Sequence, residues 1–247
     1  MIAILQSTRL IWPGTFMTRK SSLYRYAQLL IVGLSAVLLL VLSWPRLRAS
    51  ISYLPVDTAL SNYWKTRKLD NAQLNGLIER AADSIAIHDH YRYYEGLSEL
   101  KILNRKDSSR SIWQRRQDLQ DSILAAEEVV RRAPAKPRVW LRIATAKEFL
   151  VYPAEEIVPA LKMSILTGRV EPTLMLTRLE LGLRLLPAMD KEAVRLLRDQ
   201  AVLTWTIHRK HMLKRIKSGS LSLVSLREAL SENYPAIISE IEAHFAK

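Results

Sequence analysis

The stretch from Ser122 to Ala144, SILAAEEVVRRAPAKPRVWLRIA, holds the end of one predicted helix, a proline break and the start of a second helix. Pro134 ends the first helix, because proline lacks a backbone donor, and Pro137 suits the first position of the next helix. Small side chains such as Ala126 let neighbouring helices approach closely. The stretch therefore predicts two consecutive helices that pack against each other.

This arrangement resembles the junction between helix B of one repeat and helix A of the next in tetratricopeptide (TPR) repeat proteins. When Pro134 is matched to the family's terminal proline, the helix-B packing positions are Ser122, Ala126 and Val129. The helix-A positions are then filled by Trp140, Ile143 and Ala144. In this family the large aromatic side chain fills the space between adjacent hairpins.

A second, more degenerate match ends at Pro172, 38 residues after Pro134. Its packing positions on helix B and on the following helix A are Ala160, Ser164, Thr167, Leu181 and Gly182. Arg178 replaces the aromatic residue of this second repeat, and Lys147 replaces the tyrosine of the first. The resemblance covers residues 111–188 and implies an all-α, TPR-like array of antiparallel helical hairpins. An ordinary helical bundle is the alternative.

Apolar residues at helical spacing, together with capping residues, predict further helices on both sides of residues 122–144. They span residues 56–68, 69–86 with Asp70 as cap, 88–104, 111–132, 190–216 with Asp190 as cap, 221–230 and 235–245. We expect the first two of the hairpin helices, 69–86 and 88–104, to pair. The inward positions of the helix 111–132 are predicted to be Ile112, Trp113, Leu119, Ile123, Ala126 and Val130. Asp107 to Ser109 are candidate caps for that helix.

A membrane-spanning helix is predicted from Tyr26 to Trp44, where no residue is charged. At about 1.5 Å per residue, this run nearly covers the hydrocarbon core of a bilayer. Aromatic residues stand at both ends, and Pro45 is expected to stop the helix. A cleaved signal peptide is the alternative, although residues 45–50, PRLRAS, offer no cleavage site with small residues and contain two arginines.

The chain is accordingly divided into a cytoplasmic tail (1–25), a transmembrane helix (26–44), a connector (45–56) and a helical-repeat domain (57–247). Four cations precede the span, Arg9, Arg19, Lys20 and Arg25, whereas two follow it closely, Arg46 and Arg48. This bias favours an N-terminus inside the cell. We therefore expect a single-pass protein of a bacterial inner membrane with a periplasmic C-terminal domain. Met17 begins an ordinary leader, so residues 1–16 are expected to be an extension.

Composition sets limits on function. The 247 residues include no cysteine, which excludes disulfides and thiolate metal sites, and the formal net charge is +13. A basic domain suits anionic lipid, acidic polysaccharide or nucleic acid, and export would remove nucleic acid from these partners. The histidines in residues 88–96, HDHYRYYEG, do not converge on one helix face, so no metal site is predicted.

A dense basic cluster ends the helix 190–216. It contains the candidate anion-binding residues Arg209, Lys210, Lys214, Arg215 and Lys217. Cations are stabilising near a helix C-terminus, and that effect alone explains the cluster. The alternative is an anion-binding site for phosphate, uronate or lipid headgroups.

The sequence contains no nucleotide-binding loop, hydrolase motif or zinc-protease motif, and no cofactor is expected. The first hypothesis is a membrane-anchored scaffold that binds a protein partner, itself membrane-embedded, at the cell envelope. Its layout is similar to that of accessory proteins in surface polysaccharide assembly. The second is an anionic glycan- or lipid-binding module that acts through residues 208–217, and the third is an enzyme without a recognisable motif.

Overall fold

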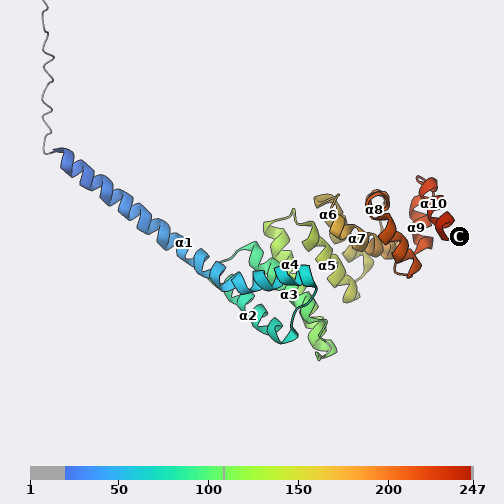
Figure 1. The fold of residues 1–247 in the computed structure, drawn as a ribbon, viewed down its shortest axis with the longest axis horizontal. Coiled ribbons are helices and arrows are strands. Elements are labelled where there is room, and N and C mark those ends of the chain that lie inside the picture. Colours follow the sequence, from blue (N-terminus) through green and yellow to red (C-terminus); the bar gives the residue numbers. More distant parts are fainter. Residues whose placement is uncertain (1–19, 108, 246–247) are drawn as a thin grey trace, which may run out of the picture. The chain divides into compact units, whose positions relative to one another are not determined.

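The computed structural model describes residues 20–107 and 109–245, with side chains from Tyr24 onward. Within these ranges the fold is helical without strands, which confirms the all-α class. In chain order the elements are α1 (Lys20–Thr66), α2 (Asn71–Ile87), α3 (Tyr91–Asn104), α4 (Ile112–Arg132), α5 (Pro137–Phe149), α6 (Ala154–Thr167), α7 (Pro172–Leu185), the short 3₁₀ helix η1 (Leu186–Ala188), α8 (Lys191–Lys217), α9 (Leu223–Leu230) and α10 (Pro235–Phe245) (Figure 1). The start at Met17 and most of the tail 1–25 lie outside the described residues.

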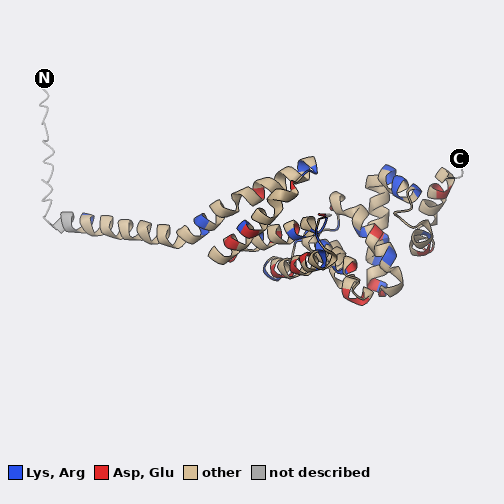
Figure 2. Ribbon diagram, turned by 90° about the horizontal axis from the view of Figure 1, so that it is seen from below, with Lys and Arg blue, Asp and Glu red and all other residues tan. Residues whose placement is uncertain are grey.

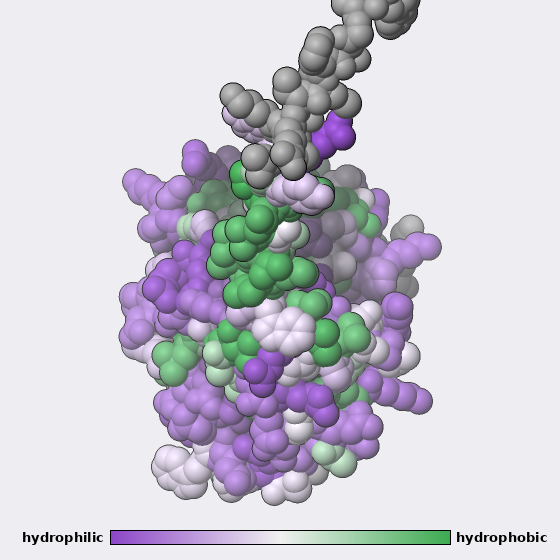
Figure 3. All heavy atoms as spheres, turned by 90° about the vertical axis from the view of Figure 1, so that its left-hand side faces the viewer, coloured by the Kyte–Doolittle hydropathy of each residue, from purple (hydrophilic) through white to green (hydrophobic). Residues whose placement is uncertain are grey.

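The chain divides into two units between Leu47 and Arg48. The described part of the first unit is the apolar half of α1. In the described chain α1 is the one helix long and apolar enough to cross a membrane, and none of its apolar window is buried. Large side chains from Leu29 to Leu42 are exposed along it, and their green spheres are prominent on the face shown in Figure 3.

The connector predicted for residues 45–56 is wrong, because α1 continues through it to Thr66, and Pro45 does not stop the helix. A proline inside a helix costs about 3 kcal/mol. After Pro45, however, Ala49, Tyr53 and Val56 recur on one face, which is buried against α2 and α3. The burial of this face provides the free energy that keeps the segment helical.

The second unit, Arg48–Lys247, consists of helices that pack on their neighbours in the chain: α2 on α3, α3 on α4, α4 on α5, α5 on α6 and α7 on α8. Its apolar core is built in successive clusters. One joins the end of α1 to α2 and α3, a larger one lies among α4 to α8, and another joins α7 and α8 to α9 and α10.

Most helix ends follow the predicted capping residues. The Asp70 carboxylate accepts from the backbone N–H of Ala72, Asp190 accepts from Ala193, and Pro137 stands in the first turn of α5. The cap expected among Asp107 to Ser109 is wrong, because Ser111 caps α4 in a reciprocal capping box with Gln114.

Two of the predicted inward residues of α4 are not buried. Leu119, Ile123, Ala126 and Val130 are buried as expected, whereas Ile112 is 70% and Trp113 80% exposed. The side chain of Asn104, the last residue of α3, donates to Asp118, in the second turn of α4. The first turn of α4 therefore extends beyond the end of α3, and its two apolar side chains stay exposed.

The small residues singled out from the sequence lie at close helix contacts. Ser122, Ala126 and Ala144 are fully buried, and Ala160 nearly so. A Cβ atom on Gly182 would lie 2.4 Å from a methyl carbon of Leu197, so α7 and α8 touch at this glycine. Trp140 is half-buried and donates its indole N–H to the carbonyl of Pro134 at 2.8 Å.

Arg178, at the aromatic position of the second expected repeat, is fully buried. It has no carboxylate partner among the described residues. Instead its guanidinium donates to the carbonyls of Ser164 and Gly168, to the Ser164 hydroxyl and to the amide oxygen of Gln200. Burial lowers the pKa of Arg178 to about 10. The arginine thus satisfies polar groups of α6 and α8 at the position where an aromatic ring was expected.

Candidate binding groove

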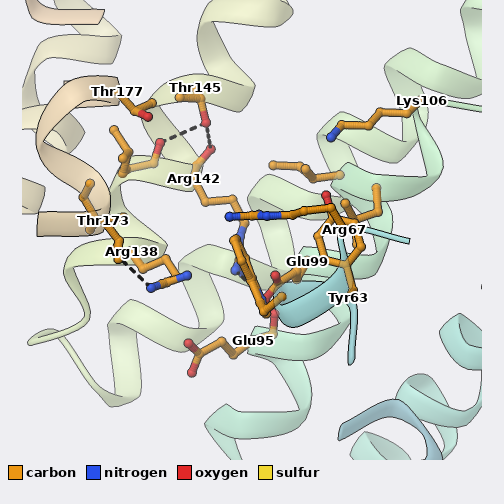
Figure 4. Close-up of a pocket in the computed structure, with 15 residues that line it drawn as sticks. Tyr63, Arg67, Glu95, Glu99, Lys106, Arg138, Arg142, Thr145, Thr173 and Thr177 are labelled. Carbon is orange, nitrogen blue, oxygen red and sulfur yellow. Dashed lines mark hydrogen bonds and ion pairs between the residues drawn. The ribbon is translucent and has the colours of Figure 1, made fainter. Parts of the chain in front are cut away.

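A hollow of about 860 Å³ lies among the end of α1 and helices α3, α5 and α7 (Figure 4). We call it the groove. Its polar and aromatic lining residues are Tyr63, Trp64, Arg67, Glu95, Glu99, Lys106, Arg138, Arg142, Thr145, Thr173 and Thr177. These residues lie in four helices or just after the ends of α1 and α3, and they are separated by up to about a hundred residues in the chain. No local sequence pattern marks the site for this reason.

The aromatic wall of the groove is formed by α1. Trp64 is 41% exposed, and the guanidinium carbons of Arg67 and Arg138 lie 4.6 and 4.8 Å from its ring centroid. Arg67 has a φ of +59°, and its backbone N–H donates to the carbonyl of Tyr63, which ends the helix. Cation–π contacts of this exposure contribute about 0.5–1 kcal/mol each, so the indole is held in place.

The carboxylates of the groove are already paired. Glu99 and Arg142 form a largely buried ion pair at 3.0 Å, and Arg142 also donates to the backbone carbonyl of Glu95. Lys136 pairs with the Glu95 carboxylate at 3.2 Å. These contacts fix α5 on α3. One oxygen of Glu99, Oε1, is buried without a hydrogen-bond partner in the described structure.

Three cations of the groove, Arg67, Lys106 and Arg138, have no carboxylate partner among residues 20–107 and 109–245. Arg138 donates to the hydroxyl of Thr173 at 3.3 Å, and Figure 4 shows the Lys106 side chain directed toward the open space. Because the remaining acids are neutralised, the groove carries excess positive charge beside an exposed indole. Such a surface suits a ligand with carboxylate groups and an apolar side chain.

The basic cluster predicted on α8 is split by its contacts. Arg209 pairs with Glu240 at 3.0 Å and lies over the ring of Trp205, and Arg215 pairs with Glu180 at 3.3 Å. For the other three, Lys210, Lys214 and Lys217, the described chain supplies no carboxylate partner. Their spacing of four and three residues places them on one helix face. Figure 2 shows blue Lys and Arg segments in the helices near the C-terminus. Only these three lysines of the cluster therefore lack a carboxylate partner in the described chain. We call Lys210, Lys214 and Lys217 the lysine stripe.

The histidines near α3 have roles in the fold. His90 caps the helix by accepting from the backbone N–H of Arg92, and its ring stacks with that of His88 at 6.1 Å. In the part of the chain that the structure covers, no three His, Asp or Glu side chains are grouped so that they could hold a metal ion.

Comparisons with protein-family models, with curated proteins and with solved structures find no match to this chain.

Proposed function

We propose that this protein is a membrane-anchored helical scaffold whose groove binds an acidic segment of a partner protein. The observation that carries the proposal is the combination of three cations without carboxylate partners and an exposed tryptophan in one hollow. Neither feature contributes to the core of the domain. Both are recurrent elements of protein recognition surfaces, where aromatic and arginine side chains carry most of the binding energy.

Each part of the groove has a role in this binding. Carboxylates of the partner bind Arg67, Lys106 and Arg138 through charge-assisted hydrogen bonds. An apolar side chain packs on Trp64, and the hydroxyl of the exposed Thr177 bonds a backbone group of the segment. The resemblance to TPR repeats supports this proposal, because stacked helical hairpins present an extended surface to a partner segment.

The membrane anchor determines in which compartment the domain binds its partner. We propose that α1 spans a bacterial inner membrane once, with residues 1–25 inside and the domain in the periplasm, as the excess of cations before the span favours. The partner is then a protein of the same membrane, and the layout is similar to that of accessory factors in surface polysaccharide assembly. A reporter fused to the C-terminus tests this orientation, since it must be active on the periplasmic side.

Charge reversal in the groove tests the proposal. The full chain with Lys106→Glu and Arg138→Glu, extracted from its native membrane, is expected to lose the partner that co-purifies with the wild-type chain. Arg195→Glu is a matched control, because Arg195 is exposed on α8 and forms no ion pair with any residue that the structure describes. An unchanged partner in the doubly reversed variant would contradict the proposal.

A second candidate function, binding of an anionic glycan or lipid, is favoured by the lysine stripe on α8. Lys210, Lys214 and Lys217 are exposed, and none is neutralised by a neighbouring carboxylate. Each such cation near an anionic lipid surface contributes about 1 kcal/mol. The variant with all three lysines changed to glutamine is expected to lose salt-sensitive binding to uronate polymers or phosphatidylglycerol vesicles, while it keeps the protein partner.

A further inference from the structure

Four large apolar side chains are exposed where α3 ends, α4 begins and α5 ends: Ile112, Trp113, Phe149 and Val151. The guanidinium carbon of Arg105, just after α3, lies 3.6 Å from the ring centroid of Phe149 at the end of α5. Leu119 of α4 and Leu150, which follows α5, share one buried cluster. These contacts place the end of α3, the second turn of α4 and the end of α5 side by side.

Val151 is held outward by a strained backbone. Its φ is +61°, a left-handed conformation that a β-branched residue rarely adopts and that costs about 1–2 kcal/mol. Backbone hydrogen bonds from Val151 to Glu148 and from Tyr152 to Lys147 maintain it. The Val151 side chain buries little of its surface within the domain, because it is 82% exposed. These two bonds close the C-terminus of α5 with a left-handed residue, and the side chain that they leave on the surface is apolar.

Arginines are frequent in the same segments of the chain, and Arg105 lies over the Phe149 ring. Arg105, Arg115 and Arg116 have no carboxylate partner in the described ranges, whereas Arg110 is paired with Asp118. The Nε atoms of Arg105 and Arg115 are buried without an acceptor. A guanidinium that has lost part of its water attracts a carboxylate at its remaining donors more strongly than a fully hydrated one does.

We propose that this end surface binds an acidic amphipathic segment of a partner protein. We define it by Arg105, Ile112, Trp113, Arg115, Phe149 and Val151. Carboxylates of the segment bind the arginines, and its apolar side chains cover Trp113 and Val151. This is a second docking site, distinct from the groove and argued from different residues. A protein is favoured over a lipid surface because the apolar half of α1 already suffices for membrane attachment, and a patch of four apolar side chains adds little to an inserted helix.

The test uses the full chain in nanodiscs of phosphatidylcholine. The probe is a fluorescein-labelled 12-residue peptide with leucine and glutamate on opposite helix faces, and binding is measured by fluorescence anisotropy. The expected result is saturable binding that Trp113→Ser weakens by about tenfold or more, as does Arg115→Gln combined with Arg116→Glu. Leu124→Ser is the matched control, because Leu124 is 62% exposed on the same helix but is not part of the end surface. Circular dichroism verifies that each variant is folded.

Three results would overturn the proposal. The first is absence of binding to the wild-type chain, and the second is equal binding to the wild-type and Trp113→Ser chains. The third is binding of phosphatidylglycerol vesicles that Trp113→Ser abolishes, which would make the end surface a lipid contact. In the second case, loss of binding in Lys106→Glu with Arg138→Glu would assign the peptide to the groove.

Discussion

Arg178 shows how a single residue sets the packing of the domain. The TPR pattern expects an aromatic side chain at this position, and the chain supplies a cation. Its guanidinium donates to carbonyl, hydroxyl and amide oxygens of Ser164, Gly168 and Gln200. The guanidinium therefore connects α6, α7 and α8 by hydrogen bonds, and we infer that it is a determinant of stability and not a ligand site.

Removal of Arg178 is expected to be severe. Arg178→Ala leaves the carbonyls of Ser164 and Gly168 without donors and opens a cavity, so the free energy of unfolding should fall by at least about 3 kcal/mol. Arg178→Lys should recover only part of this loss, because an ammonium cannot reproduce the planar set of donors. Urea unfolding of the full chain in detergent micelles measures the effect. Arg195→Ala, on the exposed face of α8, should change stability by less than about 0.5 kcal/mol.

Alanine substitutions at two helical glycines should change the free energy of unfolding in opposite directions. Gly182→Ala places a methyl group 2.4 Å from a methyl carbon of the fully buried Leu197, and we expect a loss of about 1 kcal/mol or more. Gly76→Ala adds a methyl group to open space and should raise the free energy of unfolding by about 0.5–1 kcal/mol. Changes of the same sign in urea unfolding would contradict the packing described for α7 and α8.

At the scale of elements, the predictable features were those that depend on a few neighbouring residues. Asp70, Pro137 and Asp190 mark the starts of α2, α5 and α8 because capping and proline geometry act within one turn. The wrong predictions depended on distant contacts. Pro45 does not end α1, because the face that follows it is buried against α2 and α3. Trp113 is exposed because α3 is too short to cover it.

The cap at the start of α8 should make the stability of the domain depend on pH. The Asp190 carboxylate accepts from the backbone N–H of Ala193 and from Lys162, and these bonds hold its pKa below the ordinary value of 3.8. Because the folded-state pKa is lower than the unfolded one, this stabilisation is present above about pH 4 and is lost as the pH falls through the folded-state pKa. Asp190→Asn, which keeps a capping oxygen, should reduce the loss of stability between pH 6 and pH 3. Asp83→Asn, on the exposed side of α2, should leave that loss unchanged.

At the scale of the molecule, the sequence predicted an all-α chain with one apolar helix and a basic domain, since composition and periodicity suffice for these features. It did not predict the groove. Arg67, Lys106 and Arg138 belong to separate stretches, and their lack of carboxylate partners depends on how the helices pack. The sequence indicated a candidate anion site in the basic cluster at residues 208–217. In the fold, however, Glu180 of α7 pairs with Arg215 and Glu240 of α10 pairs with Arg209. Unpaired charge is therefore a property of the fold rather than of local composition.

Binding of a partner segment in the groove is tested by photocrosslinking in living cells from a benzoylphenylalanine placed at position 177, where the exposed Thr177 lines the groove. We predict a covalent adduct with a membrane protein that disappears in the Lys106→Glu, Arg138→Glu chain. The adduct should persist when Lys210, Lys214 and Lys217 are changed to glutamine. Absence of any adduct from position 177, or an adduct that survives the reversal of both groove cations, would contradict the proposed function.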